Sequence, residues 1–180
     1  MNERVDPATV THADSLTRGF VPQADERAFR DALGRFASGV TIVTARGAQG
    51  GPVGMTANSF ASVSLDPPLV LWSVDRASHR FPVFAEAPAF AIHVLAEHQR
   101  DTALAFARDA RAFDGHPWWP NAQGVPVLDD TLARFECRTH AVHDGGDHAI
   151  VVGYVERAKL ADGAPLVWSD GDFGRFTAFG

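Results

Sequence analysis

Cysteine is nearly absent from this chain of 180 residues, and long hydrophobic runs are missing altogether. Because Cys137 is alone, no internal disulfide can form, and we expect a reducing compartment, the cytoplasm. No apolar run approaches the roughly 20 residues that cross a bilayer, so we expect no membrane partner. The first residues lack the apolar centre of a secretory signal, which agrees with a cytoplasmic location.

An excess of positive charge and the common glycine-rich signatures are missing too. The net charge of −6 offers no electrostatic footprint for nucleic acid. The chain has neither a P-loop nor a Gly-x-Gly-x-x-Gly pattern, which argues against an NTPase or a Rossmann site. It has no Gly-x-Ser-x-Gly pattern, which argues against a serine hydrolase.

A metal site is not predicted, although His140, His143 and His148 lie close together in the sequence. On a strand, residues 140 and 143 are an odd number apart and face opposite sides. His143 and His148 flank a turn and can approach each other, but two ligands do not complete a zinc site.

What the chain does have is the composition of a globular domain, with 46% hydrophobic and 21% charged residues. Residues 1–24 show no sustained periodicity and contain Pro7 and Pro22, so we expect a flexible N-terminal arm. Residues 25–180 carry no repeat or linker composition, and their number suits one domain with a sizeable core.

Two helices and many strands are predicted. One helix begins at Asp25, a good N-cap, and ends at Gly39, with an apolar stripe that packs on the core. A second helix, at 97–108, presents an apolar face of Leu104 and Ala107, with Ala103 and Phe106 beside them. Strand patterns lie at residues 40–44, 69–74, 89–95, 133–142, 149–155 and 166–168. These predict a mainly β fold with flanking helices, an antiparallel barrel and not a doubly wound sheet.

Two single residues, one turn and one aromatic loop can also be placed from the sequence. We expect His93 to be a hydrogen-bonded histidine of the core or its rim and not a ligand, and Cys137 to lie in the core. Asp144–Asp147 is predicted to form a hairpin turn. The aromatic loop at 113–120 either covers a pocket or closes an edge of the core.

The stretch Gly54–Pro68 is predicted to connect two strands. Residues 56–59 are small and polar, so a flat ligand can approach their backbone amides, while Phe60, Val63 and Leu65 fasten the far end. An ordinary hairpin connection with turn residues is the alternative.

The junction at 75–80 lies between a strand and a short helical piece. Its two arginines, its serine and the first amides of a helix would suit a phosphate group. A solvated charged turn is the alternative.

Seven blocks of sequence, in order, resemble the short-chain flavin reductases, and the resemblance covers about residues 27 to 176. The most specific block is Thr56-Ala57-Asn58-Ser59. The blocks are residues 29–44, 54–68, 76–78, 90–95, 113–115, 132–138 and 146–148.

The resemblance implies a split β-barrel of the FMN-binding type, assembled as a homodimer. It implies an NAD(P)H:flavin oxidoreductase that reduces FMN or FAD with NADH or NADPH and supplies the reduced flavin to a separate monooxygenase. A non-catalytic flavin carrier or sensor of the same fold is the main alternative, and an oxidase with tightly held FMN is another. Both flavins and both nicotinamide nucleotides remain open.

The resemblance also implies site residues. Residues 56–59 would contact the isoalloxazine and 75–78 would lie near the ribityl phosphate. The full cofactor-binding set is Met55, Thr56, Ala57, Asn58, Ser59, Ser62, Asp75, Arg76, Ala77, Ser78, Arg80 and Phe113. The nicotinamide nucleotide would meet Arg35, Ser38, Asp147, His148 and Phe173. Of these, His148 is the predicted catalytic residue, which guides the nicotinamide, and Phe173 stands where such families often have tyrosine.

Overall fold

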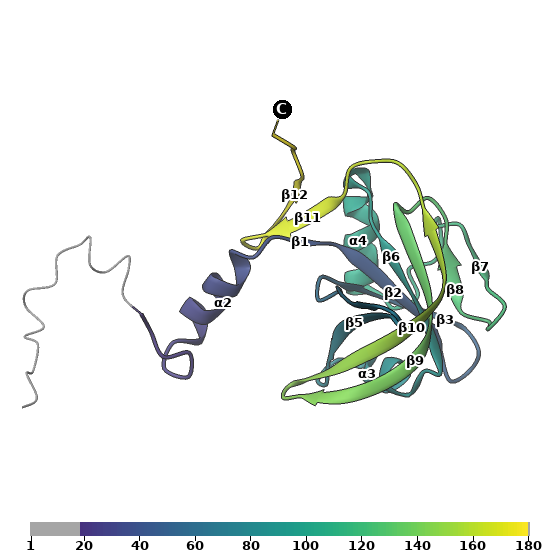
Figure 1. The fold of residues 1–180 in the computed structure, drawn as a ribbon, viewed down its shortest axis with the longest axis horizontal. Helices are drawn as coiled ribbons and strands as arrows, with labels where there is room; N and C mark the ends of the chain where they lie inside the picture. The colour runs from purple at the N-terminus through teal and green to yellow at the C-terminus, as the bar shows by residue number, and fades with distance from the viewer. Residues whose placement is uncertain (1–18, 180) are drawn as a thin grey trace, which may run out of the picture. The chain divides into compact units, whose positions relative to one another are not determined.

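The computed structural model describes residues 19–179, and these form a mainly antiparallel β structure with few helices (Figure 1). The chain divides into two units, Met1–Phe36 and Ala37–Gly180, which are described separately. Most of the predicted N-terminal arm, residues 1–18, lies outside the described residues. None of the described helices is long and apolar enough to cross a membrane.

The described part of the first unit consists mainly of helix α2 (Glu26–Gly34). The predicted N-cap is confirmed, because the Asp25 carboxylate accepts a hydrogen bond from the backbone N–H of Ala28 at 2.9 Å. The predicted end at Gly39 is wrong. Gly39 already belongs to strand β1 (Ser38–Gly39), which pairs with Val167 and Trp168, so its backbone is extended.

The apolar stripe of α2 is not buried within the described residues. Phe29 is 41% exposed, Leu33 is 59% exposed and Phe36, just after the helix, is 81% exposed. The predicted helix is therefore present, but its apolar face stays exposed within residues 19–179.

The second unit is organised around a seven-stranded antiparallel sheet in the order β3-β2-β6-β9-β10-β5-β4. Its strands are β2 (Thr41–Arg46), β3 (Pro52–Ala57), β4 (Ala61–Leu65), β5 (Pro68–Asp75), β6 (Ala89–Val94), β9 (Ala133–Gly145) and β10 (His148–Leu160). The antiparallel pairing is confirmed, and so is the turn at Gly146 and Asp147, which joins the long green hairpin of β9 and β10 in Figure 1. Within residues 19–179 no backbone ladder joins β3 to β4, so hydrogen bonds do not close the sheet into a barrel.

Smaller elements flank this sheet. Strand β1 joins β11 (Leu166–Ser169) and β12 (Asp172–Arg175), and β7 (Trp118–Pro120) pairs with β8 (Pro126–Leu128). The helical elements of this unit are α3 (Phe81–Glu86), η2 (Glu97–Gln99) and α4 (Arg100–Arg108).

The prediction that Gly54–Pro68 merely connects strands is wrong. Residues 54–57 pair along β2, from Thr44 opposite Gly54 to Thr41 opposite Ala57. Residues 61–65 pair with β5 as strand β4. Only residues 58–60 lie between the two strands, so the small polar block sits at the end of a strand and not in a loop.

Helix α4 packs on β3 through one side of the predicted apolar face. Ala103 and Phe106 are fully buried, whereas Ala107 is exposed and Leu104 is half-buried. The reason lies in Gly54, where a Cβ atom would come within 2.5 Å of the Phe106 ring. The absence of a side chain at Gly54 lets this ring reach the β3 backbone, which turns Phe106 inward.

The two core residues predicted from the sequence are confirmed. Cys137 is fully buried, and burial raises the pKa of its thiol to about 12. His93 is also fully buried, with Nδ1 3.0 Å from the carbonyl oxygen of Ile42, while Nε2 accepts from the Leu128 N–H at 3.0 Å. Burial lowers the pKa of His93 to about 4, so the imidazole is neutral and Nδ1 carries the proton.

We predict that His93 makes stability depend on pH in the acid range. The unfolded chain protonates this imidazole near pH 6.5 and the folded chain only near pH 4, so unfolding takes up a proton in between. The free energy of unfolding should fall by up to about 3 kcal/mol as the pH drops through this window.

Urea titrations of wild type and His93→Asn across this range measure the effect. The asparagine side chain of the variant keeps a donor and an acceptor but does not titrate. The variant should therefore be less stable than wild type near neutral pH, and this difference in the free energy of unfolding should shrink as the pH falls. A deficit that is constant with pH would contradict the assignment.

Candidate functional site

A cavity of about 280 Å³ lies where the end of β3 meets α4 and β11–β12. We call it the β3 pocket. It is lined by Val40, Thr56, Ala57, Asn58, Ala103, Leu104, Ala107, Trp168 and Phe173. The structure thus brings together three residues of the small polar block with Phe173. The rings of Trp168 and Phe173 meet edge to face, with centroids 4.8 Å apart.

The backbone of β3 is available at this pocket because β3 is an outer strand that pairs only with β2. The Gly54 N–H points away from β2 and donates to the Ala110 carbonyl at 2.8 Å. Directions alternate along a strand, so the Thr56 N–H points to the same free edge. Asn58 follows the strand and is exposed. The pocket thus combines apolar walls with backbone and amide groups at its rim.

The hydroxyl groups of the small polar block, residues 56–59, bond it to α4 and to β5. Thr56 Oγ1 donates to the Ala103 carbonyl of α4 at 2.6 Å. Ser59 Oγ donates to the Ser73 carbonyl at 3.0 Å and accepts from the Ser73 N–H at 2.9 Å. These bonds fix the pocket wall, and they leave backbone groups and the Asn58 amide for a ligand.

Arg80 ties α4 to β3. Its guanidinium donates to the Phe106 carbonyl at 2.6 Å, to the Ala107 carbonyl at 3.2 Å and to the Gly54 carbonyl at 3.4 Å. Cations favour the last carbonyls of a helix. Partial burial lowers the pKa of Arg80. Its donors point to carbonyl groups of α4 and β3, and its role at the flavin phosphate stays a prediction.

The rest of the predicted phosphate seat meets the tip of the β9–β10 hairpin. Asp75 is opposite His148 in the sheet, and Arg76 forms an ion pair with Asp144 at 2.7 Å. Asp147 Oδ1 lies 2.8 Å from His148 Nδ1, and this hydrogen bond lowers the pKa of Asp147. We call these five residues the hairpin cluster.

The turn before α3 is built by its own side chains. The Asp75 carboxylate accepts from the Ala77 N–H at 2.7 Å, and Ser78 Oγ accepts from the Arg80 N–H at 3.2 Å. None of these residues, and none of the hairpin cluster, lines the β3 pocket. In residues 19–179 no three metal-type side chains come together as a possible metal centre.

Strand β5 connects the β3 pocket to the hairpin cluster. Ser59 bonds Ser73, which lies opposite Ile150, and Asp75 lies opposite His148 two residues further along. Two residues of strand span about 7 Å. Ser59, a predicted ring-binding residue, and His148, a predicted nucleotide-binding residue, are therefore linked through β5, although neither of them lines the β3 pocket.

Four predicted residues lie elsewhere. Phe113 is 6% exposed and packs edge to face on Phe106, so this part of the aromatic loop closes the core. Met55 packs against the core, and Ser62 is exposed on β4. Arg35 follows α2 in the first unit.

Ser38 lies close to the pocket but does not line it. It pairs with Trp168, and its buried Oγ has no hydrogen-bond partner within the described residues. Sequence reasoning missed Trp168, Leu104 and Ala107 as pocket residues. The short aromatic strand ending at Trp168 was a weak signal, and only the pairing of β1, β11 and β12 places it beside β3.

The cavity fits a ring system better than a whole dinucleotide. Small-molecule pockets start at roughly 300 Å³, and they combine apolar walls with a few polar groups. The β3 pocket has this size and this lining, with Trp168, Phe173 and Leu104 opposite the edge of β3. A flat heteroaromatic group with polar atoms along one edge matches it.

The chain belongs to the family of the flavin reductase like domain, whose profile matches residues 33–177. It is 58% identical over 159 residues to the FMN reductase (NADH) SmoA of Agrobacterium fabrum, covering 88% of this chain and 91% of that protein.

Two further relatives extend this result. The reductase component of the flavin-dependent trigonelline monooxygenase of Acinetobacter baylyi is 45% identical, over 82% of this chain and 48% of that protein. The NADH:FAD oxidoreductase SgcE6 of Streptomyces globisporus, solved with NAD and FAD fragments, superposes with a TM-score of 0.81. It is 37% identical over 89% of this chain and 98% of its own.

Proposed function

We propose that this chain is an NADH-dependent flavin reductase that reduces FMN or FAD and supplies reduced flavin to a separate monooxygenase. One observation carries the proposal: Thr56, Ala57 and Asn58, which the family resemblance assigns to the flavin ring, line one largely apolar pocket. The relatives support it, since one is named an FMN reductase (NADH) and another a monooxygenase reductase component.

The residues of the β3 pocket suit this chemistry without an acid–base pair. A bound flavin accepts a hydride from the nicotinamide, so the cofactors supply the reactive electrons. The outward Thr56 N–H and the Asn58 amide would orient the polar edge of the ring and stabilise the negative charge of its reduced form. Trp168 and Phe173 would exclude water from one side.

The hairpin cluster would guide the nicotinamide nucleotide. His148 is 43% exposed and held by Asp147, so its ring has a fixed position at the end of β10. We propose that His148 positions the nicotinamide and that Arg76, anchored on Asp144, adds a positive charge near the phosphate of the flavin.

A split barrel and a homodimer complete the proposal. Ser59, just after the first strand of the sheet order, bonds Ser73 in the sixth, so the sheet curls until its ends approach. This supports a barrel that is closed by side chains. The exposed stripe of Phe29, Leu33 and Phe36 supports a second copy of the chain as its cover. A single buried cysteine suits a reducing cytoplasm.

Steady-state oxidation of NADH and NADPH with added FMN, FAD or riboflavin tests the function. We expect turnover in the wild type and, for Asn58→Leu, a loss of flavin affinity of roughly tenfold or more, because the branched side chain obstructs the ring seat. Ser64→Ala, on β4, is the matched control and should behave as wild type.

The same assay separates the alternatives. Flavin binding without turnover would identify a carrier or sensor. Purified protein that stays yellow through dialysis would indicate an oxidase with tightly held FMN. Unchanged flavin affinity in Asn58→Leu would exclude the β3 pocket as the ring site.

His148→Ala tests the positioning role. We expect a rise in the KM for NADH or a slower hydride step, by roughly tenfold, with flavin affinity unchanged. Stopped-flow reduction of bound flavin measures both quantities. A change in flavin affinity alone would show that the role is wrongly assigned.

Leu33→Glu tests the dimer. Light scattering should give the mass of two chains for wild type and of one chain for the variant, because a charge cannot be buried without a partner. Arg30→Glu, on the same helix, controls for the added charge. A wild-type mass of one chain would contradict the proposal.

A further inference from the structure

Beyond Phe173 lies a second cavity of about 330 Å³. We call it the arginine hollow. It is lined by Glu97, His98, Arg100, Phe173, Gly174 and Arg175. Phe173 borders both this hollow and the β3 pocket, so the two cavities adjoin at its ring.

The charges of the arginine hollow are only partly compensated. The Arg100 guanidinium lies over the Phe173 ring, 5.6 Å from its centroid, and has no carboxylate partner among the described residues. Arg175 Nε is 3.9 Å from Glu97, and both side chains are well exposed. One carboxylate therefore faces two guanidinium groups, which leaves a positive site beside the apolar pocket.

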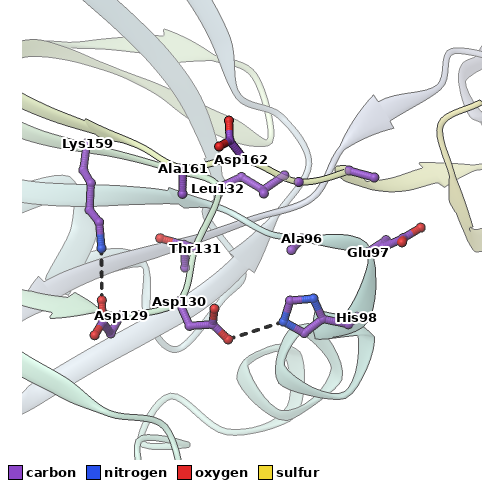
Figure 2. Close-up of a pocket in the computed structure, with 12 residues that line it drawn as sticks. Ala96, Glu97, His98, Asp129, Asp130, Thr131, Leu132, Lys159, Ala161 and Asp162 are labelled. Carbon is purple, nitrogen blue, oxygen red and sulfur yellow. Dashed lines mark hydrogen bonds and ion pairs between the residues drawn. The ribbon is translucent and has the colours of Figure 1, made fainter. Parts of the chain in front are cut away.

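A third cavity, of about 460 Å³, continues from the second, because Glu97 and His98 border both. Figure 2 shows its side chains, with Lys159 on Asp129 and His98 on Asp130. We call it the acidic hollow, since Asp162 and Glu97 add to these two aspartates.

The acidic hollow also contains a buried hydroxyl group that makes no hydrogen bond within the described residues. Thr131 is 3% exposed, and its buried Oγ1 has no hydrogen-bond partner within the described residues. Carboxylates and a hydroxyl suit the hydroxyl groups of a sugar, and carboxylates oppose a phosphate.

We propose that Arg100 and Arg175 bind the diphosphate of the nicotinamide dinucleotide whose ring stacks on the flavin at the β3 pocket. The inference rests on the proposed function and adds the residues that hold the far end of the ligand. Guanidinium groups are the strongest protein partners of phosphate oxygens.

The order of the three cavities matches the order of groups in a dinucleotide. The apolar pocket is followed by two arginines and then by carboxylates, as the nicotinamide and its ribose are followed by the diphosphate and then by the adenosine ribose. With the nicotinamide stacked on the flavin and the diphosphate on the two arginines, the adenosine ribose of NADH would reach the acidic hollow. There Asp130 and Asp162 would accept from a 2′-hydroxyl and repel a 2′-phosphate, so NADH is preferred to NADPH.

The first experiment measures binding of ADP-ribose by calorimetry, which does not depend on turnover. The double variant Arg100→Gln, Arg175→Gln should bind roughly tenfold more weakly than wild type, and Arg100→Lys should recover part of the loss. Arg157→Gln, which removes an exposed arginine on β10, is the control and should bind as wild type.

The second experiment identifies the source of the diphosphate. If it belongs to NADH, the double variant should raise the KM for NADH roughly tenfold and leave that for reduced nicotinamide mononucleotide unchanged. A fall in the affinity for FAD but not for FMN, with the KM for NADH unchanged, would assign the diphosphate to the flavin and overturn the inference. Unchanged values for all four ligands, with unchanged ADP-ribose binding, would overturn the inference.

The third measurement addresses the acidic hollow. In Asp130→Asn, Asp162→Asn the ratio of kcat/KM for NADPH over NADH should rise several-fold, because two charges that oppose a 2′-phosphate are removed. An unchanged ratio would exclude the adenosine ribose from this cavity. If the wild type binds ADP-ribose through the arginines but does not oxidise NADH, the proposed function is refuted. The assignment of the arginine hollow as a diphosphate site is then unaffected.

Discussion

The close approach of α4 to β3 is the constraint on which the rest of the site depends. It requires Gly54, because any Cβ there would overlap the Phe106 ring. Arg80 then bonds the last carbonyls of α4 and the Gly54 carbonyl, so the helix end and the strand are held as one piece. With α4 held in this way, its outer residues Leu104 and Ala107 become the wall opposite the edge of β3.

A second link brings the strands of the site together. Ser59 exchanges two hydrogen bonds with Ser73, so the chain that leaves β3 at one end of the sheet is fixed to β5 near the other end. The same link fixes the position of His148, because His148 lies opposite Asp75, which is only two residues beyond Ser73 on β5. The hydroxyls of the small polar block thus assemble the site, and its backbone and the Asn58 amide are left for the ligand.

The sequence allowed most strands, the N-cap Asp25, and the burial of His93 and Cys137 to be predicted, because each follows from local patterns. It did not reveal that Gly54–Leu65 pairs as two strands, since small polar residues resemble a turn unless their partners are known. Arg80 suggested an anion site by its position, but its contacts with α4 are long-range and invisible in the sequence. The place of Trp168 in the pocket could not be predicted either, because it depends on the long-range pairing of Trp168 with Ser38.

The distribution of polar groups around the β3 pocket fits a reaction in which the cofactors carry the electrons. Acid–base catalysis needs a titratable side chain at the reacting atoms, and none of the residues that line the β3 pocket has one. What the pocket supplies is shape, through Trp168 and Phe173, and fixed donors along one strand edge. Hydride transfer needs orientation above all, and aligned reactants lower a barrier by several kcal/mol. The protein therefore contributes to the reaction by the rigidity of the contacts among β3, α4 and β5.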